Sequence, residues 1–178
     1  MKLFRIKNNY KAANQETGAV EKVKEEYLVS AVNYTDAESF IVNYNETRGH
    51  NKFIEAEYEI VKEKFPWYNI MLNDVFDFEP GEKVCGYDEL FFNDDTDRLF
   101  AVTVRFLGNK EANEKDYNKT YYIPAKSVVD AIKYLKSRVV NEDDEYMVTK
   151  TAADNMVSLF LTEELHESMR NESMRNGL

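Results

Sequence analysis

The sequence predicts an α+β protein made of two tandem β-β-α-β-β repeats related by pseudo-twofold symmetry, with antiparallel sheets and one helix per repeat. Three observations predict it. The segment KLFRI at residues 2–6 returns as RLFAV at residues 98–102. The segment YLVSA at residues 27–31 returns as YYIPA at residues 121–125. An Asp-Ala pair follows each copy of this second segment at the same distance, and each pair opens an apolar pattern of helical period.

The first segment of each repeat has the alternation of a β-strand. In residues 2–10, Phe4, Ile6 and Tyr10 fall on one face, and basic or polar residues fall on the other. Residues 98–106 show the same pattern more cleanly, with phenylalanine and valine on one face. Both segments are therefore expected to form the first strand of a sheet.

A second strand follows each first strand across a polar connection that is typical of a hairpin. The tips of the two hairpins are expected at residues 14–18 and 109–113, where Asn and Glu recur. The second strands are expected over residues 23–31 and 119–125, in which apolar residues again alternate with polar ones.

A helix is expected after each second strand. Asn33 and Ser127 occupy equivalent cap positions, where a side-chain oxygen accepts a hydrogen bond from the first turn. Asp36 and Asp130 follow three residues later, where an acid suits the positive end of a helix. A competing capping box starts two residues after Asn33. The residues that then share one helical face are Ala37, Phe40, Ile41 and Tyr44 in the first helix, and Ala131, Tyr134, Leu135 and Arg138 in the second.

Two further strands complete each repeat in this interpretation. The third strands are expected over residues 54–60 and 146–152. The fourth strands are expected over residues 87–92 and 155–161. The resulting divisions are residues 1–63 for the first repeat, 64–86 for an insertion, 87–161 for a strand, an acidic hairpin and the second repeat, and 162–178 for a tail. The tail holds a tandem pentapeptide, ESMRN, and is expected to be a frayed helix or disordered.

Composition restricts the partners and the compartment. The 178 residues carry 33 acidic against 23 basic side chains, a net charge of −10, which on average repels bare nucleic acid. Such a charge fits a binder of basic partners or a mimic of nucleic acid. The single cysteine, Cys85, excludes an intramolecular disulfide framework. No apolar run has the length of a membrane span and nothing at the N-terminus resembles a signal peptide, so a cytoplasmic protein without membrane contact is expected.

The histidines, the cysteine and the acidic cluster do not lie in recognisable catalytic or metal-binding patterns. His50 falls in an expected turn, His166 falls in the charged tail where a solvated side chain is expected, and Cys85 is interpreted as a buried or half-buried residue. The acidic cluster at residues 94–97 suits a hairpin turn better than a calcium or magnesium site, because it lacks the spacing of a calcium loop. No glycine-rich phosphate loop precedes a helix. We therefore expect no catalytic residues, no metal and no cofactor.

Aromatic strand residues suggest one possible surface. Tyr27, Tyr121 and Tyr122, with Lys24 and Lys119, form a candidate nucleic-acid surface if these strands lie side by side with their rings exposed. The simpler interpretation, which we favour for most of the rings, is that alternate aromatic residues fill the core beneath the helices.

The pattern EYLVSA at residues 26–31, followed by YTDAE at residues 34–38, resembles a family of domains of unknown function found in bacteria and their phages. The DRLF segment at residues 97–100 and the YIPA strand at residues 122–125 are similar to the second half of that family. The resemblance covers roughly residues 2–161 and implies a duplicated β-β-α-β unit. It brings no activity and no functional residues.

Duplication, acidity and the lack of catalytic motifs favour a non-enzymatic interaction protein that binds another protein through sheet edges, loops or its acidic surface. The resemblance implies the setting of a phage or a mobile element. Two alternatives are a single-stranded nucleic-acid-binding protein that uses aromatic strands, and an acidic mimic that occupies a nucleic-acid site on another protein.

Overall fold

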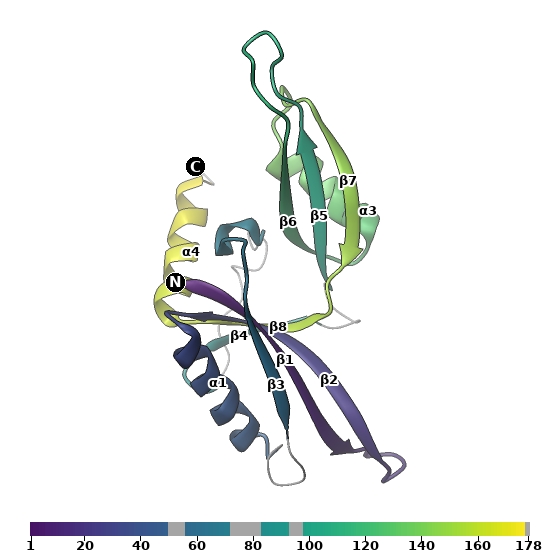
Figure 1. The fold of residues 1–178 in the computed structure, drawn as a ribbon, viewed down its shortest axis with the longest axis vertical. Coiled ribbons are helices and arrows are strands. Elements are labelled where there is room, and N and C mark those ends of the chain that lie inside the picture. Colours follow the sequence, from purple (N-terminus) through teal and green to yellow (C-terminus); the bar gives the residue numbers. More distant parts are fainter. Residues whose placement is uncertain (50–55, 72–82, 93–97, 177–178) are drawn as a thin grey trace. The chain divides into compact units, whose positions relative to one another are not determined.

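Figure 1 shows the computed structural model, in which residues 1–49, 56–71, 83–92 and 98–176 are described. The chain divides into two compact units, each with its own sheet, and the predicted α+β class is confirmed. Unit 1 comprises Met1–Trp67, Val75–Phe91 and Met156–Leu178, and unit 2 comprises Tyr68–Asp74 and Phe92–Asn155. The chain therefore passes from unit 1 to unit 2 and back twice.

Unit 1 is built on a five-stranded sheet with the strand order β3-β1-β2-β8-β4. Its strands are β1 (Lys2–Ala13), β2 (Val20–Ala31), β3 (Glu57–Lys62), β4 (Asp88–Phe91) and β8 (Met156–Leu161). Neighbouring strands are antiparallel except β2 and β8, which run parallel. In the β1–β2 ladder Phe4 lies opposite Val29 and Ile6 lies opposite Tyr27, so the alternation in the sequence gathers these residues on one face.

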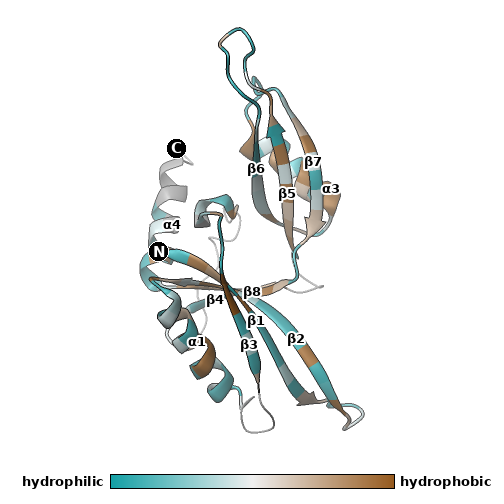
Figure 2. Ribbon diagram, in the orientation of Figure 1, coloured by the Kyte–Doolittle hydropathy of each residue, from teal (hydrophilic) through white to brown (hydrophobic). Residues whose placement is uncertain are grey.

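Helix α1 (Tyr34–Thr47) packs on that face. The Asn33 side chain accepts a hydrogen bond of 3.0 Å from the backbone N–H of Asp36, which confirms the predicted N-cap. The predicted apolar face is also confirmed, and Figure 2 shows hydrophobic residues along the middle of the helix. Its buried apolar residues are Ala37, Phe40, Ile41 and Tyr44.

The core of unit 1 combines aromatic rings with one buried polar pair. The rings of Tyr27, Tyr44 and Phe160 meet edge to face, with centroids 5.3 to 5.8 Å apart. Asn8 of β1 and Asn45 of α1 exchange amide hydrogen bonds of 2.7 and 3.2 Å, and neither side chain is more than 1% exposed. This reciprocal pair fixes α1 against β1, because a displaced helix would leave both buried amides without these partners.

Unit 2 is built on a three-stranded antiparallel sheet with the order β6-β5-β7. The elements are β5 (Arg98–Phe106), β6 (Tyr117–Ala125), helix α3 (Val128–Tyr134), its π-helical continuation η2 (Leu135–Val139) and β7 (Tyr146–Ala153). The Ser127 side chain accepts a hydrogen bond of 3.2 Å from the backbone N–H of Asp130, so this N-cap is confirmed as well. Alternate residues of β5, among them Val102 and Val104, pack with Ala131 and Leu135 in a separate core.

Part of the segment predicted as an insertion lines the edge of β6. After the short helix η1 (Trp67–Asn69), the backbone N–H of Met71 donates to the Tyr122 carbonyl at 2.7 Å. The Asn69 side chain donates to the Thr120 carbonyl at 3.1 Å. Residues 69–71 therefore pair with an edge strand of unit 2.

The prediction of two complete β-β-α-β-β repeats is wrong in its last strand. Residues 156–161, expected to close the second repeat, form β8 in the other unit, between β2 and β4. The composition of β8 explains this position: Leu159, Phe160 and Leu161 are consecutive and almost fully buried, so the strand requires cover on both faces.

The expectation of one helix per repeat is also corrected. The described residues contain three α-helices, because the predicted tail forms α4 (Glu163–Asn176). The second repeat has α3 and unit 1 has both α1 and α4. His50 and the acidic cluster at residues 94–97 lie outside the described residues.

Candidate binding surfaces

The predicted nucleic-acid surface does not form as expected. Tyr27 lies in β2 and Tyr121 and Tyr122 lie in β6, which belong to two different sheets. Tyr27 is 1% exposed and Tyr121 is 6% exposed, while Tyr122 is half-buried. A base stacks only on an accessible ring face, so the two buried rings cannot serve as a platform, and the core-filling interpretation describes them correctly.

The two predicted cations have different environments. The ammonium group of Lys119 lies over the Tyr121 ring, 4.8 Å from its centroid, in a cation–π contact within unit 2. Lys24 is exposed on β2 of unit 1 and points to the face opposite α1. Of the five predicted residues, Lys24 alone belongs to the cluster of cations described next.

Lys24 has two lysine neighbours on the same face of the β1–β2 hairpin. Lys11 lies directly opposite Lys22, and Asn9 lies directly opposite Lys24. Directly opposite residues of an antiparallel pair project from the same face with Cβ atoms about 5 Å apart. Lys11, Lys22 and Lys24, here called the lysine cluster, are exposed, and none of them forms an ion pair with another described residue.

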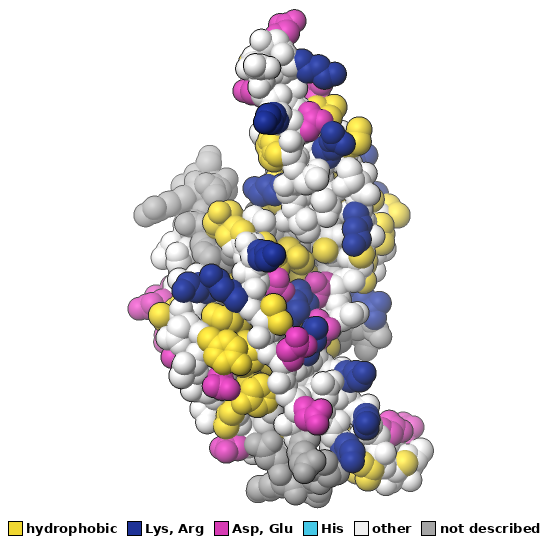
Figure 3. All heavy atoms as spheres, in the orientation of Figure 1, with side chains coloured by type: hydrophobic (Ala, Val, Ile, Leu, Met, Phe, Trp, Pro, Cys, Tyr) yellow, Lys and Arg dark blue, Asp and Glu magenta, His cyan; other side chains and the backbone are white. Residues whose placement is uncertain are grey.

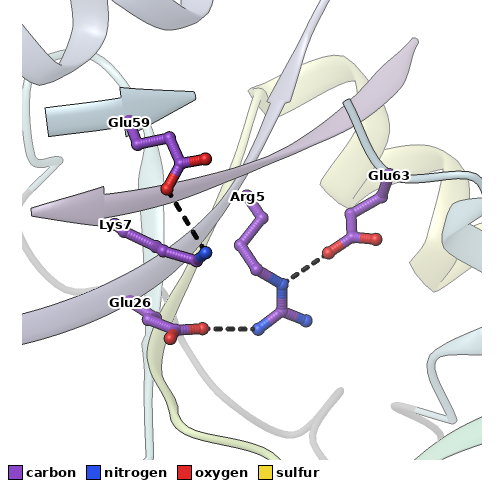
Figure 4. Close-up of polar contacts among 5 residues, drawn as sticks. All are labelled: Arg5, Lys7, Glu26, Glu59 and Glu63. Atoms are coloured by element: carbon purple, nitrogen blue, oxygen red, sulfur yellow. Dashed lines mark hydrogen bonds and ion pairs between the residues drawn. The ribbon is translucent and has the colours of Figure 1, made fainter. Parts of the chain in front are cut away.

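Cations nearer the middle of the same face are, in contrast, paired with acids (Figure 4). Arg5 donates to Glu26 at 3.0 Å and also donates to Glu63 through its Nε. The Lys7 ammonium lies 3.3 Å from a Glu59 oxygen. Along β1 the face therefore changes from compensated charge to uncompensated positive charge toward the hairpin tip.

The lysine cluster borders a shallow concave surface of about 390 Å³, which Asn9 and Glu57 also line. Figure 3 shows Lys and Arg side chains gathered over the distal ends of β1 and β2, at the lower right of the view. Three positive charges face one negative charge here, on a protein whose net charge is −10.

A second surface of unit 1 is aromatic and lies on the other face of the sheet, at its edge. Tyr34, on the first turn of α1, is 50% exposed, and Tyr58, on β3, is 36% exposed. The Tyr58 hydroxyl donates to Glu38 at 3.3 Å, one helical turn beyond Tyr34. Figure 3 shows hydrophobic side chains gathered between α1 and β3. Tyr34, Tyr58 and the edge strand β3 are here called the tyrosine edge.

His166 is placed differently from the sequence expectation. Instead of being solvated in a tail, it is 5% exposed, and its Nδ1 lies 2.8 Å from Oδ2 of Asp88 on β4. An ion pair of 2.6 Å between Lys83 and Glu163 joins the same two segments. The first turn of α4 is thus attached to unit 1, and the His166–Asp88 contact has a structural role there.

Buried tyrosines in the core of unit 1 have raised pKa values. Burial is the largest cause that raises the pKa of Tyr27, with a hydrogen bond to Glu25 as the next. Burial also raises the pKa of Tyr44 to about 12. Each hydroxyl therefore remains protonated across the physiological range, in which these rings are packing and hydrogen-bonding groups.

The described part of the chain contains no group of three or more His, Cys, Asp or Glu placed to hold a metal ion. It also contains no helix that has both the length and the apolar character to cross a membrane.

Known proteins give a partial comparison. Residues 2–73 match the model of a family described as a domain of unknown function (DUF4494). The matched stretch contains β1, β2, α1 and β3, and so carries both the lysine cluster and the tyrosine edge. No curated protein and no solved structure matches the chain.

Sequence reasoning missed Lys11, Tyr34 and Tyr58. Alternation already places Lys22 and Lys24 on one face, but the position of Lys11 opposite Lys22 depends on the length and geometry of the hairpin turn. The tyrosine edge depends on which strand lies at the edge of the sheet, which local patterns do not encode.

Proposed function

We propose that this is a non-enzymatic binding protein that recognises another protein at the tyrosine edge, by adding an extended segment of the partner to β3. The observation that supports it is the exposure of Tyr34 and Tyr58 beside an edge strand. Tyrosine is enriched among the residues that dominate protein–protein binding energies, because its large ring is rigid and carries a polar group.

Strand addition is supported by the position of β3. Among the described strands β3 pairs with β1 alone, so one side of its backbone faces away from the sheet. An edge of this kind offers backbone N–H and C=O groups to an incoming strand, and the alternating side chains provide specificity.

The two faces of β3 specify the chemistry of the partner segment. On the face shared with α1, Tyr58 and Ile60 favour apolar side chains. On the other face Glu57 is exposed and favours Lys or Arg, and the exposed Glu59 already forms an ion pair with Lys7. The proposed partner segment is therefore extended and alternates apolar with basic residues, which also suits the net charge of −10.

A labelled peptide of alternating Lys and Val tests this proposal by fluorescence anisotropy. Two control peptides are a block-sequence peptide of the same composition and an alternating peptide N-methylated at every second residue, which lacks the donors for one edge. We expect only the unmodified alternating peptide to bind. The double variant Tyr34→Ala/Tyr58→Ala is expected to bind it at least about tenfold more weakly, the equivalent of about 1.4 kcal/mol.

The matched control removes two exposed apolar side chains elsewhere, through Val128→Ala and Val129→Ala on α3. It is expected to bind like the unaltered protein. Equal binding of the N-methylated peptide would exclude strand addition, and equal binding by the tyrosine variant would exclude the tyrosine edge.

We also propose that the two units arose by duplication of a β-β-α-β unit. In both sheets the first strand lies between the second and the third. The hairpin tips also match: the Asn14 side chain accepts hydrogen bonds from the backbone of residues 16 and 17, and the Asn109 side chain accepts them from residues 111 and 112. A residue with positive φ follows four positions after each asparagine, Gly18 and Asn113. A phage or mobile-element accessory protein, as the resemblance implies, would use such a unit for binding.

A further inference from the structure

The side chains of the lysine cluster are not used by the proposed strand addition, because they lie on β1 and β2 and not on the open edge of β3, although Glu57 of β3 lies on the same face. The arrangement of the cluster is unfavourable for the free protein. Lys11 and Lys22 are directly opposite each other, and like charges in this position repel. Their repulsion is not relieved by any ion pair with a described residue.

The β5–β6 hairpin of unit 2 also carries a cation near its tip, but there the charge is compensated within the protein. Toward the tip of the β5–β6 hairpin, Arg105 forms an ion pair of 2.7 Å with Asp116. A second oxygen of Asp116 accepts a hydrogen bond from the Gly108 backbone at 3.1 Å. Among the described residues the lysine cluster of unit 1 has no such acidic partner. The negative charges of a ligand would therefore compensate it best.

The chemistry of the cluster favours phosphate over the carboxylates of a protein. Lysine is depleted in the centres of protein–protein interfaces, where aromatic and apolar residues dominate. Lysine is, in contrast, a common phosphate ligand and supplies sequence-independent affinity for nucleic acid. No exposed aromatic ring lines this concave surface to anchor a peptide, since Tyr10 is half-buried.

A single strand suits this site better than a duplex. The surface is a shallow hollow on a sheet, with the Asn9 amide next to Lys24. The Watson–Crick edges of an unpaired strand are free to reach such an amide, whereas in a duplex these edges are already paired with each other.

We propose that Lys11, Lys22 and Lys24 bind the phosphate backbone of single-stranded nucleic acid, with Asn9 contacting a base or sugar. The site stands independently of the tyrosine edge. The ring-stacking mechanism expected from the sequence is replaced by backbone contacts, and Lys24 is the residue common to both.

The test is an anisotropy titration of the full chain with a labelled mixed-sequence single-stranded oligonucleotide at several salt concentrations. Each phosphate neutralised in a single strand contributes about −0.7 to the slope of log K against log salt, so three lysines give a slope of about −2. This slope corresponds to about 20-fold weaker binding on going from about 50 to 200 mM salt. The variant Lys22→Gln is expected to reduce the slope to about −1.4, and Lys11→Gln/Lys22→Gln/Lys24→Gln is expected to abolish binding.

The matched control carries the same change of charge on unit 2, through Lys126→Gln, Lys133→Gln and Lys136→Gln, all at exposed positions. It is expected to keep the slope of the unaltered protein. Circular dichroism confirms that both triple variants fold, and the cluster variant is expected to melt no lower than the unaltered protein because a like-charge pair is removed.

Three results would overturn the proposal. The first is no oligonucleotide binding at about 50 mM salt, and the second is equal loss in the two triple variants. The third is tighter lysine-dependent binding of polyglutamate, of phosphatidylserine vesicles or of duplex DNA than of the single strand, which would assign the cluster to that ligand. Loss of peptide binding at the tyrosine edge would leave these readouts unchanged, so the two proposals fail separately.

Discussion

Replacing either member of the Asn8–Asn45 pair by leucine is expected to destabilise unit 1 far more than replacing both. Each single variant removes two amide hydrogen bonds and leaves a buried amide without that partner, at positions no more than 1% exposed. An unsatisfied buried polar group costs about 1–3 kcal/mol, so we expect about 2–3 kcal/mol for Asn45→Leu and a similar loss for Asn8→Leu.

The double variant replaces both amides by apolar groups of similar shape, for which the cost is small. We expect it to lie within about 1 kcal/mol of the unaltered protein, which makes the coupling energy at least about 3 kcal/mol in magnitude. Each single variant should lower Tm by about 5–10 °C, given about 2–4 °C per kcal/mol for a chain of this size.

Urea denaturation of the four proteins, followed by circular dichroism, measures this double-mutant cycle. An unchanged m-value establishes that the same surface is exposed in each case. Additive effects, with the double variant about as unstable as the sum of the single variants, would refute the reasoning, since they would show that the two amides do not depend on each other.

Three further predictions concern separate parts of the fold. Burial raises the pKa of Tyr44 to about 12, so its contribution to stability is fully present below pH 10 and is lost as the pH rises through about 12. A pH series of denaturation curves should show this loss for the unaltered protein and a smaller loss for Tyr44→Phe, and identical pH profiles of the two proteins would contradict the prediction. Gly108→Ala would place a Cβ 2.5 Å from the backbone oxygen of Glu114 and should cost about 1–3 kcal/mol by thermal denaturation, whereas an added Cβ at Gly18 meets nothing within 4 Å and should cost less, about 1 kcal/mol, from its positive φ alone. Asp88→Ala should remove the partner of His166 and speed hydrogen exchange in the first turn of α4 but not in α1, and unchanged exchange in α4 would show that the contact does not hold the helix.

Capping chemistry and hydrophobic periodicity correctly predicted those elements that are determined by residues close together in the sequence. The N-caps Asn33 and Ser127 and the apolar face of α1 follow from capping chemistry and helical period, and the structure confirms them. The hairpin partners of β1 and β5 follow from alternation and from the polar connections between the paired strands.

The predictions from sequence were wrong where the structure depends on contacts between residues far apart in the chain. Residues 156–161 were correctly predicted as a strand, but which sheet they join depends on which position covers Leu159, Phe160 and Leu161 on both faces. Apart from Leu165, the sequence around His166 is charged or polar, and its burial coincides with the contact with Asp88, 78 positions earlier.

The candidate surfaces were predicted less well than the fold. The tyrosines selected from the sequence are in or near the core, because an aromatic residue on a strand is as well suited to packing as to stacking. Lys24 was named from the sequence as part of a candidate nucleic-acid surface, but its proximity to Lys11 and Lys22 depends on the hairpin register, which brings the three to the same face.

The central claim is that a partner segment adds to β3. Hydrogen–deuterium exchange with and without the alternating Lys-Val peptide tests it most directly, because strand addition protects backbone amides at the edge that is used. We predict new protection in residues 57–62 and none in β7, an edge strand of unit 2. Protection that appears in β7, or binding with no new protection in β3, would contradict the claim.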